Sequence, residues 1–155
     1  MTEKTFTFAS GAGSQISGHL EPPEGTPRGW AIFAHCFTCG KDSRAAVYIS
    51  RALSRAGIGV LRFDFAGTGI DGGSGESLSF ASDIDDLRAA AKAMAAAGMA
   101  PSLLVGHSLG GIAVIVAAEE LPDVAAVVTI GAPADLQHIL RFFAPRDLDT
   151  ISTAD

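Results

Sequence analysis

Five residues near the middle of the chain have the types and spacing that suit a nucleophile. Gly106, His107, Ser108, Leu109 and Gly110 form a G-x-S-x-G sequence between an apolar strand-like run and a helix-like run of small residues. The turn must be sharp, and side chains at the two glycine positions would collide with neighbouring backbone. The serine then stands at a helix N-terminus, where N–H groups favour developing negative charge. We predict that Ser108 attacks carbonyl carbon and that the Leu109 N–H donates to the resulting oxyanion.

A second group is the pair Cys36 and Cys39, in C-x-x-C spacing directly after the apolar run WAIFAH. A redox dithiol should open a helix, but Gly40, Lys41 and Asp42 intervene before the next helix begins, which leaves the thiols in a loop. No histidine or second cysteine pair elsewhere is expected to supply metal ligands. We therefore expect two thiols without redox or metal function in a loop whose backbone matters more than its sulfurs.

The elements that must position these groups follow from periodicity. Two alternating segments around the turn GAG predict an N-terminal antiparallel hairpin. Runs that are apolar on both faces predict buried parallel strands, and the segments between them have helical spacing with capping residues such as Asp42, Ser82, Gly57 and Gly98. The predicted fold class is α/β, with strands at 30–35, 59–65, 102–107 and 125–133 and helices at 43–56, 83–97 and 109–122.

Composition narrows the class of protein. The chain has 155 residues, 48% of them hydrophobic, which is enough for one domain with a real core. Its net charge of -6 and its lack of a basic cluster argue against nucleic acid as a partner. The apolar segments are too short to span a membrane and no signal peptide is recognisable, so we expect a cytoplasmic protein with reduced cysteines. No cofactor is predicted.

The motifs in series resemble those of the α/β-hydrolase superfamily. HCFTCGKD resembles its oxyanion loop, with Cys36 at the usual glycine position, and Asp64, Gly67 and Gly69 resemble its D-x-x-G-x-G loop. With LLVGHSLGG and VVTIGAPAD, the chain is similar to the N-terminal hydrolase module of bacterial proteins that fuse such a hydrolase to an OsmC-like domain. The resemblance implies a cofactor-free serine esterase in which the Phe37 N–H is the second oxyanion donor.

The same resemblance places the remaining triad residues after later strands, in the order Ser, Asp or Glu, His. We therefore expect one partial domain over 1–155, with a hairpin at 1–21, a core at 29–133 and the start of a cap or tail at 134–155. Asp135 follows the sixth strand and is a candidate for the triad acid. His138 comes three residues later on the same predicted short helix, so it is not expected to reach Ser108.

Two functions remain open at this point. The first is hydrolysis of a small acyl substrate, such as a carboxylic ester, with the missing triad residues outside the chain. The second is a catalytically incomplete binding or regulatory module of the same frame. In either case the sixth strand would leave an apolar edge, which favours a homo-oligomer or pairing with the missing C-terminal part.

Overall fold

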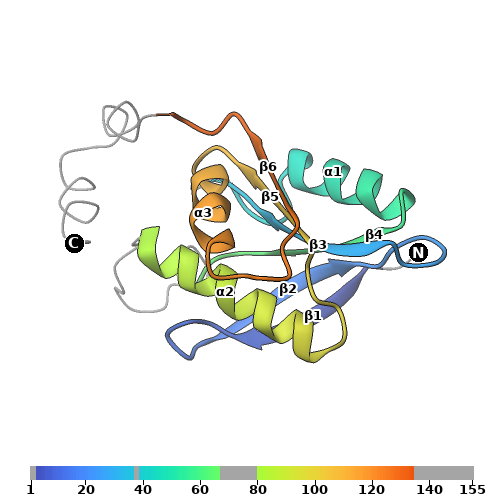
Figure 1. Ribbon diagram of the computed structural model, residues 1–155, viewed down its shortest axis with the longest axis horizontal. Coiled ribbons are helices and arrows are strands. Elements are labelled where there is room, and N and C mark those ends of the chain that lie inside the picture. The colour runs from blue at the N-terminus through green and yellow to red at the C-terminus, as the bar shows by residue number, and fades with distance from the viewer. Residues whose placement is uncertain (1–2, 37–38, 67–79, 135–155) are drawn as a thin grey trace.

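A computed structural model describes residues 3–36, 39–66 and 80–134 of the chain. Two strands open it, and strands and helices then alternate as the sequence predicts (Figure 1). In chain order the elements are β1 (Lys4–Ala9), β2 (Gln15–Glu21), β3 (Gly29–Ala34), α1 (Arg44–Arg55), β4 (Ile58–Phe63), α2 (Phe80–Ala96), β5 (Leu103–His107), α3 (Leu109–Ala118) and β6 (Ala126–Ile130).

The strands form one sheet in the order β1-β2-β4-β3-β5-β6. β1 and β2 make the predicted antiparallel hairpin, and β2 also runs antiparallel to β4. β3 lies between β4 and β5, and all the pairings from β4 to β6 are parallel. The register places Ala34 beside Gly106, so the loop after β3 and the turn after β5 start at the same edge of the sheet.

Helices cover both faces of this sheet (Figure 1). Successive side chains of a strand point to opposite faces, and β3 shows the consequence. Ile32 and Ala34 join the larger core with α2 and α3, whereas Ala31 and Phe33 pack in the smaller core with α1. The parallel strands therefore need apolar residues on both faces, which explains their continuous apolar runs.

The helix ends correct three details of the prediction. Ser43, not Asp42, caps α1 by accepting the Ala46 N–H. α2 begins at Phe80, so Ser82 lies inside its first turn. Phe80 packs on the core, and a capping pattern in the sequence does not reveal such a tertiary contact. α3 ends at Ala118 instead of continuing to Pro122.

The glycine ends, in contrast, are confirmed. Gly57 and Gly98 have φ angles of 83° and 75°, the left-handed conformation that terminates a helix after its last turn. At the end of α2, Met99 N–H donates to Met94 O at 2.8 Å, which completes the usual glycine-dependent cap.

β6 lies at the edge of the sheet and, among the described strands, pairs only with β5. All five of its residues are exposed, including Val127, Val128 and Ile130. The predicted apolar edge is therefore confirmed for the described part of the chain. Among the described helices, none is both long and apolar enough to cross a membrane.

Candidate active site

Ser108 lies at the tight turn between β5 and α3. Its φ of 55° makes it the single non-glycine residue with a positive φ among those the structure describes. Strain of this kind persists only where the surrounding structure enforces it, and here the Ser108 N–H donates to Ile130 O at 2.9 Å. Ser108 is the N-cap of α3, but its side chain makes no capping hydrogen bond. The hydroxyl is therefore not used to cap the N-terminus of α3.

The two glycines of the motif allow this turn to pack. A β-carbon on Gly106 would run into the carbonyl group of Gly110 and lie 2.6 Å from the α-carbon of Gly111. A β-carbon on Gly110 would meet the carbonyl oxygen of Ala34, and that of His35 at 2.6 Å. The predicted backbone collisions are thus confirmed. Gly110 in addition brings the start of α3 against the end of β3.

Leu109 is the first residue of α3, and the N–H groups of the first helical turn have no acceptor within the helix. Its N–H is thus available in the way the oxyanion prediction requires. Phe37, the predicted second donor, lies outside the described residues, as do Gly67, Gly69, Asp135 and His138. Their predicted roles stay predictions.

The loop after β3 is held at its start by His35, which is 1% exposed. The His35 Nδ1 lies 2.7 Å from the Cys36 carbonyl oxygen. Since a carbonyl oxygen only accepts, Nδ1 carries the hydrogen and donates it. Three residues on, the Cys39 N–H donates to the same Cys36 oxygen at 3.0 Å. His35 therefore has a structural role at the base of the predicted oxyanion loop.

Cys36 and Cys39 are joined by a disulfide, and their α-carbons are 5.1 Å apart. The prediction of two separate thiols is therefore wrong for this structure. It rested on the redox state expected of the compartment. The Cys39 N–H bond to the Cys36 carbonyl oxygen instead brings the two residues together, and α-carbons 5.1 Å apart lie within the range that a disulfide spans.

The far end of the loop is held by Asp64, the first residue after β4 in the D-x-x-G-x-G motif. Asp64 accepts the Lys41 N–H at 2.7 Å and the Lys41 ammonium at 2.8 Å, and His35 Nε2 lies 3.4 Å away. His35, and then Lys41, hold the pKa of Asp64 well below its ordinary value. Asp64 in turn raises the pKa of Lys41. Sequence reasoning flagged Asp64 as part of a turn but missed Lys41, which is 23 positions away.

Arg62 supports the same loop from β4 with a fully buried side chain. It donates to the Lys41 carbonyl oxygen at 2.5 Å and to Glu3 Oε2 at 2.8 Å, and Glu21 lies 3.7 Å away. A buried guanidinium needs such partners, since an unpaired charge in the core is strongly destabilising. Sequence reasoning missed Arg62 because it lies within an otherwise apolar strand.

Two carboxylates of α2 lie near these loops. Asp86, 2% exposed, accepts the Gly11 N–H at 3.1 Å and the Ala66 N–H at 2.9 Å, and thereby ties the hairpin turn and the segment after β4 to α2. Burial raises its pKa. Burial, with the Asp86 charge adding to it, also raises the pKa of Asp83 to about 7, although His35 opposes this shift.

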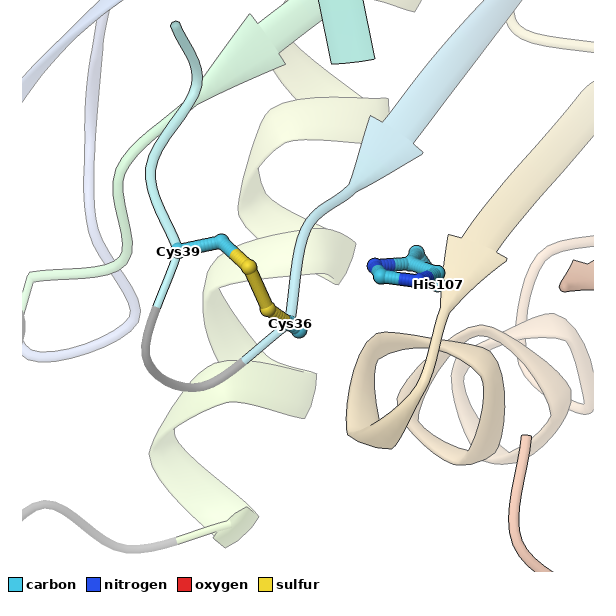
Figure 2. Close-up of side chains that lie close together, drawn as sticks. All are labelled: Cys36, Cys39 and His107. Carbon is cyan, nitrogen blue, oxygen red and sulfur yellow. A yellow bond between two sulfur atoms is a disulfide. The ribbon is translucent and has the colours of Figure 1, made fainter. Parts of the chain in front are cut away.

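His107, the last residue of β5, lies beside the disulfide (Figure 2). One ligand atom of each of Cys36, Cys39 and His107 lies within 4.8 Å of the others. No local pattern in the sequence places a histidine beside the cysteines, and the expectation that no histidine supplies a metal ligand stays a prediction. The pairing of β3 with β5 brings them together, and separation along the chain conceals it.

A cavity of about 140 Å³ lies away from this site, between α2 and the segment that joins α3 to β6. Its lining includes Pro101 and Val124, which precede β5 and β6, so it opens at the edge where these strands begin. Ser108 follows the end of β5. The cavity therefore lies at the opposite edge of the sheet from the nucleophile elbow.

Comparison with solved structures agrees with this geometry. The esterase domain from a Rhodothermus marinus protein is 45% identical, with a TM-score of 0.73 over 90% of this chain and 54% of that chain. An α/β serine hydrolase without a lid from Xanthomonas campestris is 25% identical, with a TM-score of 0.75 over 88% of this chain and 64% of that chain. A Pyrococcus furiosus esterase, at 18% identity and a TM-score of 0.75 over 97% of this chain and 61% of its own, shares the fold.

The chain thus spans 54% to 64% of the lengths of these three proteins. No curated protein matches the sequence. The model of the family described as serine aminopeptidase, S33, matches residues 25–150, which include the elbow and the loop after β3. With its parallel sheet, its helices on both faces and its G-x-S-x-G elbow, the chain belongs to this family of α/β serine hydrolases.

Proposed function

We propose that the chain carries the nucleophile and oxyanion site of a serine esterase that acts on small carboxylic esters. The observation that carries the proposal is the strained Ser108, held at the N-terminus of α3 with a hydroxyl that makes no capping bond. A half-buried serine at an elbow of this kind is suited to attack a carbonyl carbon. The likeness to an esterase domain at 45% identity supports an ester as the substrate.

The proposed reaction has two stages. Ser108 Oγ attacks the carbonyl carbon while its proton passes to a base, and the oxyanion accepts hydrogen bonds from the Leu109 and Phe37 N–H groups. The carbon–oxygen bond to the alcohol then breaks, and the alcohol takes the proton as it leaves. Water hydrolyses the acyl-enzyme by the same route, releasing the acid and restoring the serine. The loop bonds of His35, Lys41 and Asp64 would hold the donor side of this site.

We propose that the triad base and acid are residues outside the described part of the chain. Asp135 stays a candidate acid, and no described histidine is assigned as the base. We also propose that the chain forms one partial domain with a core at 29–133, and that it is linked to an OsmC-like domain. These two proposals are supported by the resemblance of the HCFTC segment and by the fact that the Rhodothermus marinus relative is itself a domain of a protein. The cytoplasmic location stays a prediction from the sequence.

The test is labelling of the 155-residue chain with a fluorophosphonate, followed by mass spectrometry of the labelled peptide. We expect slow but stoichiometric labelling at Ser108 and a burst of product with an activated aryl ester, both lost in Ser108→Ala. Without a triad histidine, steady-state turnover should be lower by a factor on the order of 10³ or more than for a complete enzyme.

The matched control is Ser17→Ala, since Ser17 is an exposed serine on β2, away from the elbow. It should label like the parent chain. Labelling spread over several serines, or unchanged in Ser108→Ala, would contradict the proposal and favour the alternative of a binding module without turnover. A matching anilide substrate distinguishes ester from amide preference.

A further inference from the structure

Cys36, Cys39 and His107 come from two neighbouring parallel strands whose carboxyl ends meet at one edge of the sheet. Cys36 follows the end of β3, His107 ends β5, and the register pairs Ala34 with Gly106. The hydrogen bond from the Cys39 N–H to the Cys36 carbonyl oxygen keeps Cys39 close to Cys36. As a result, the two sulfurs and one imidazole nitrogen lie within 4.8 Å of one another, and Figure 2 shows the ring beside the sulfur pair.

The three ligand types define which ion this cluster could hold. Two thiolates and an imidazole are soft to borderline donors, which favour Zn²⁺ over Mg²⁺ or Ca²⁺. C-x-x-C is also a usual spacing for a zinc-binding cysteine pair. Two thiolates balance the charge of one Zn²⁺, which suits a site where Cys36 is 9% exposed and its two companions are half-buried.

The disulfide and the zinc site exclude each other. In a disulfide neither sulfur is a thiolate, and only thiolates bind zinc strongly. A phosphine reductant with water would convert the disulfide into two thiols, which release their protons to the solvent when they bind Zn²⁺. The phosphine is oxidised to its oxide, the S–S bond takes up two electrons, and water supplies the oxygen atom and the two protons of the resulting thiols.

Only a small rearrangement separates the two forms. With Zn–S bonds of about 2.3 Å in tetrahedral geometry, the two sulfurs would be about 3.8 Å apart. Rotation of the cysteine side chains can supply that spacing over an α-carbon separation of 5.1 Å. The loop ends are meanwhile held by His35 at Cys36 O and by Asp64 at Lys41.

We propose that Cys36, Cys39 and His107 bind one Zn²⁺ in the reduced chain, and that the Cys36–Cys39 disulfide is the metal-free form of the same site. Three protein ligands leave a fourth position for water or another small ligand. The site depends on the cysteine pair and the histidine, and it does not depend on whether Ser108 hydrolyses an ester.

The test uses the full chain, reduced with a phosphine and freed of reductant under nitrogen. Co²⁺ serves as the probe, because thiolate ligands give a near-ultraviolet charge-transfer band and tetrahedral geometry gives intense visible bands. When Co²⁺ is added to the reduced chain, we expect both the charge-transfer band and the visible bands. One equivalent of Zn²⁺ should displace the cobalt, and one zinc per chain should remain bound after gel filtration. The oxidised chain should give no thiolate band.

His107→Asn keeps both thiols and should weaken Zn²⁺ binding at least about tenfold, and Cys39→Ser should abolish the thiolate band characteristic of the pair. His19→Asn is the matched control, because His19 lies on β2 beside Glu3 and Asp42, and it should bind like the parent chain.

Two results would overturn the proposal. The first is a reduced chain that shows no thiolate band with Co²⁺, and the second is a His107→Asn variant that binds Zn²⁺ as tightly as the parent. If that variant does not fold, zinc-edge X-ray absorption of the parent chain decides. Two sulfur ligands with nitrogen or oxygen ligands support the site, and any other sulfur count contradicts it.

Discussion

The α-carbon of Gly110 lies against the carbonyl oxygen of His35, so close that a β-carbon at position 110 would be 2.6 Å from that oxygen. This contact joins the helix that follows Ser108 to the loop that follows β3. The serine and its expected oxyanion donors come from these two segments, so the contact decides how the site is assembled. Four predictions test this site and the sheet that carries it.

Gly110→Ala should separate these two segments. The added methyl group meets backbone atoms of Ala34 and His35, which cannot rotate away as a side chain can. We expect a loss of about 1–3 kcal/mol in the free energy of unfolding and slower fluorophosphonate labelling of Ser108. Urea unfolding and labelling rates measure the two effects.

The control for this change is Gly29→Ala, at the other end of β3, where the new methyl group would meet only the Ser102 hydroxyl oxygen at 3.1 Å. It should leave labelling nearly unchanged. Equal labelling rates in the two variants would show that close packing at Gly110 is not needed for the elbow.

Asp64→Asn should loosen the loop after β3 and change acid stability. The pKa of Asp64 in the fold lies below its ordinary value of 3.8, so the ionised carboxylate stabilises the fold above about pH 4, and this contribution is lost as the pH falls below that value. Because the carboxylate is partly exposed, we expect the variant to lose about 1 kcal/mol at pH 7 and the difference from the parent to shrink at pH 3.

Urea unfolding at several pH values checks this, with Asp123→Asn, at an exposed position before β6, as the control. A parent and an Asp64→Asn variant that differ equally at pH 7 and pH 3 would show that the charge of Asp64 is not what holds Lys41.

Asp83→Asn should act in the opposite direction. The pKa of Asp83 in the fold is about 7, above its ordinary value of 3.8, so the folded chain binds this proton more tightly than the unfolded chain. Stability from this group is therefore full below about pH 4 and declines as the pH rises through 7. We expect the variant to be more stable than the parent by about 1–3 kcal/mol at pH 8. Its free energy of unfolding should also fall less than that of the parent as the pH rises.

Asp85→Asn is the matched control on the same helix, because Asp85 is exposed and paired with Arg88. Thermal unfolding between pH 4 and pH 8 compares the three proteins. If Asp83→Asn follows the parent curve across this range, burial does not raise the Asp83 pKa as described.

Val128→Lys should reduce self-association of the 155-residue chain. Val127, Val128 and Ile130 are exposed on the edge strand β6, and an apolar edge with unpaired backbone groups is a template for further strand pairing. We expect the parent chain to form concentration-dependent dimers or larger species, and the charged edge to shift the population toward monomer. Sedimentation velocity at several concentrations measures the change.

The comparison variant is Tyr48→Lys, because Tyr48 is 61% exposed on α1 and does not belong to the edge. A parent chain that remains monomeric at the highest concentrations, or an equal effect of both lysines, would contradict an association through β6.

Local sequence determined much of this protein. Runs that are apolar on both faces predicted the parallel strands, and alternation around GAG predicted the hairpin. G-x-S-x-G predicted a turn that only glycines could flank, and the collisions at Gly106 and Gly110 confirm it. These features depend on residues close together along the chain, so backbone geometry and the periodicity of burial are sufficient to infer them.

Only the tertiary structure decided which distant residues share the site. The pairing of β3 with β4 and β5 brings Asp64 to Lys41 and His107 to the cysteine pair, and no local pattern encodes the strand order. Packing likewise extends α2 to Phe80 and buries Arg62 under the loop. Parallel strands place their carboxyl ends at one edge, so residues far apart along the chain become neighbours once the sheet has formed.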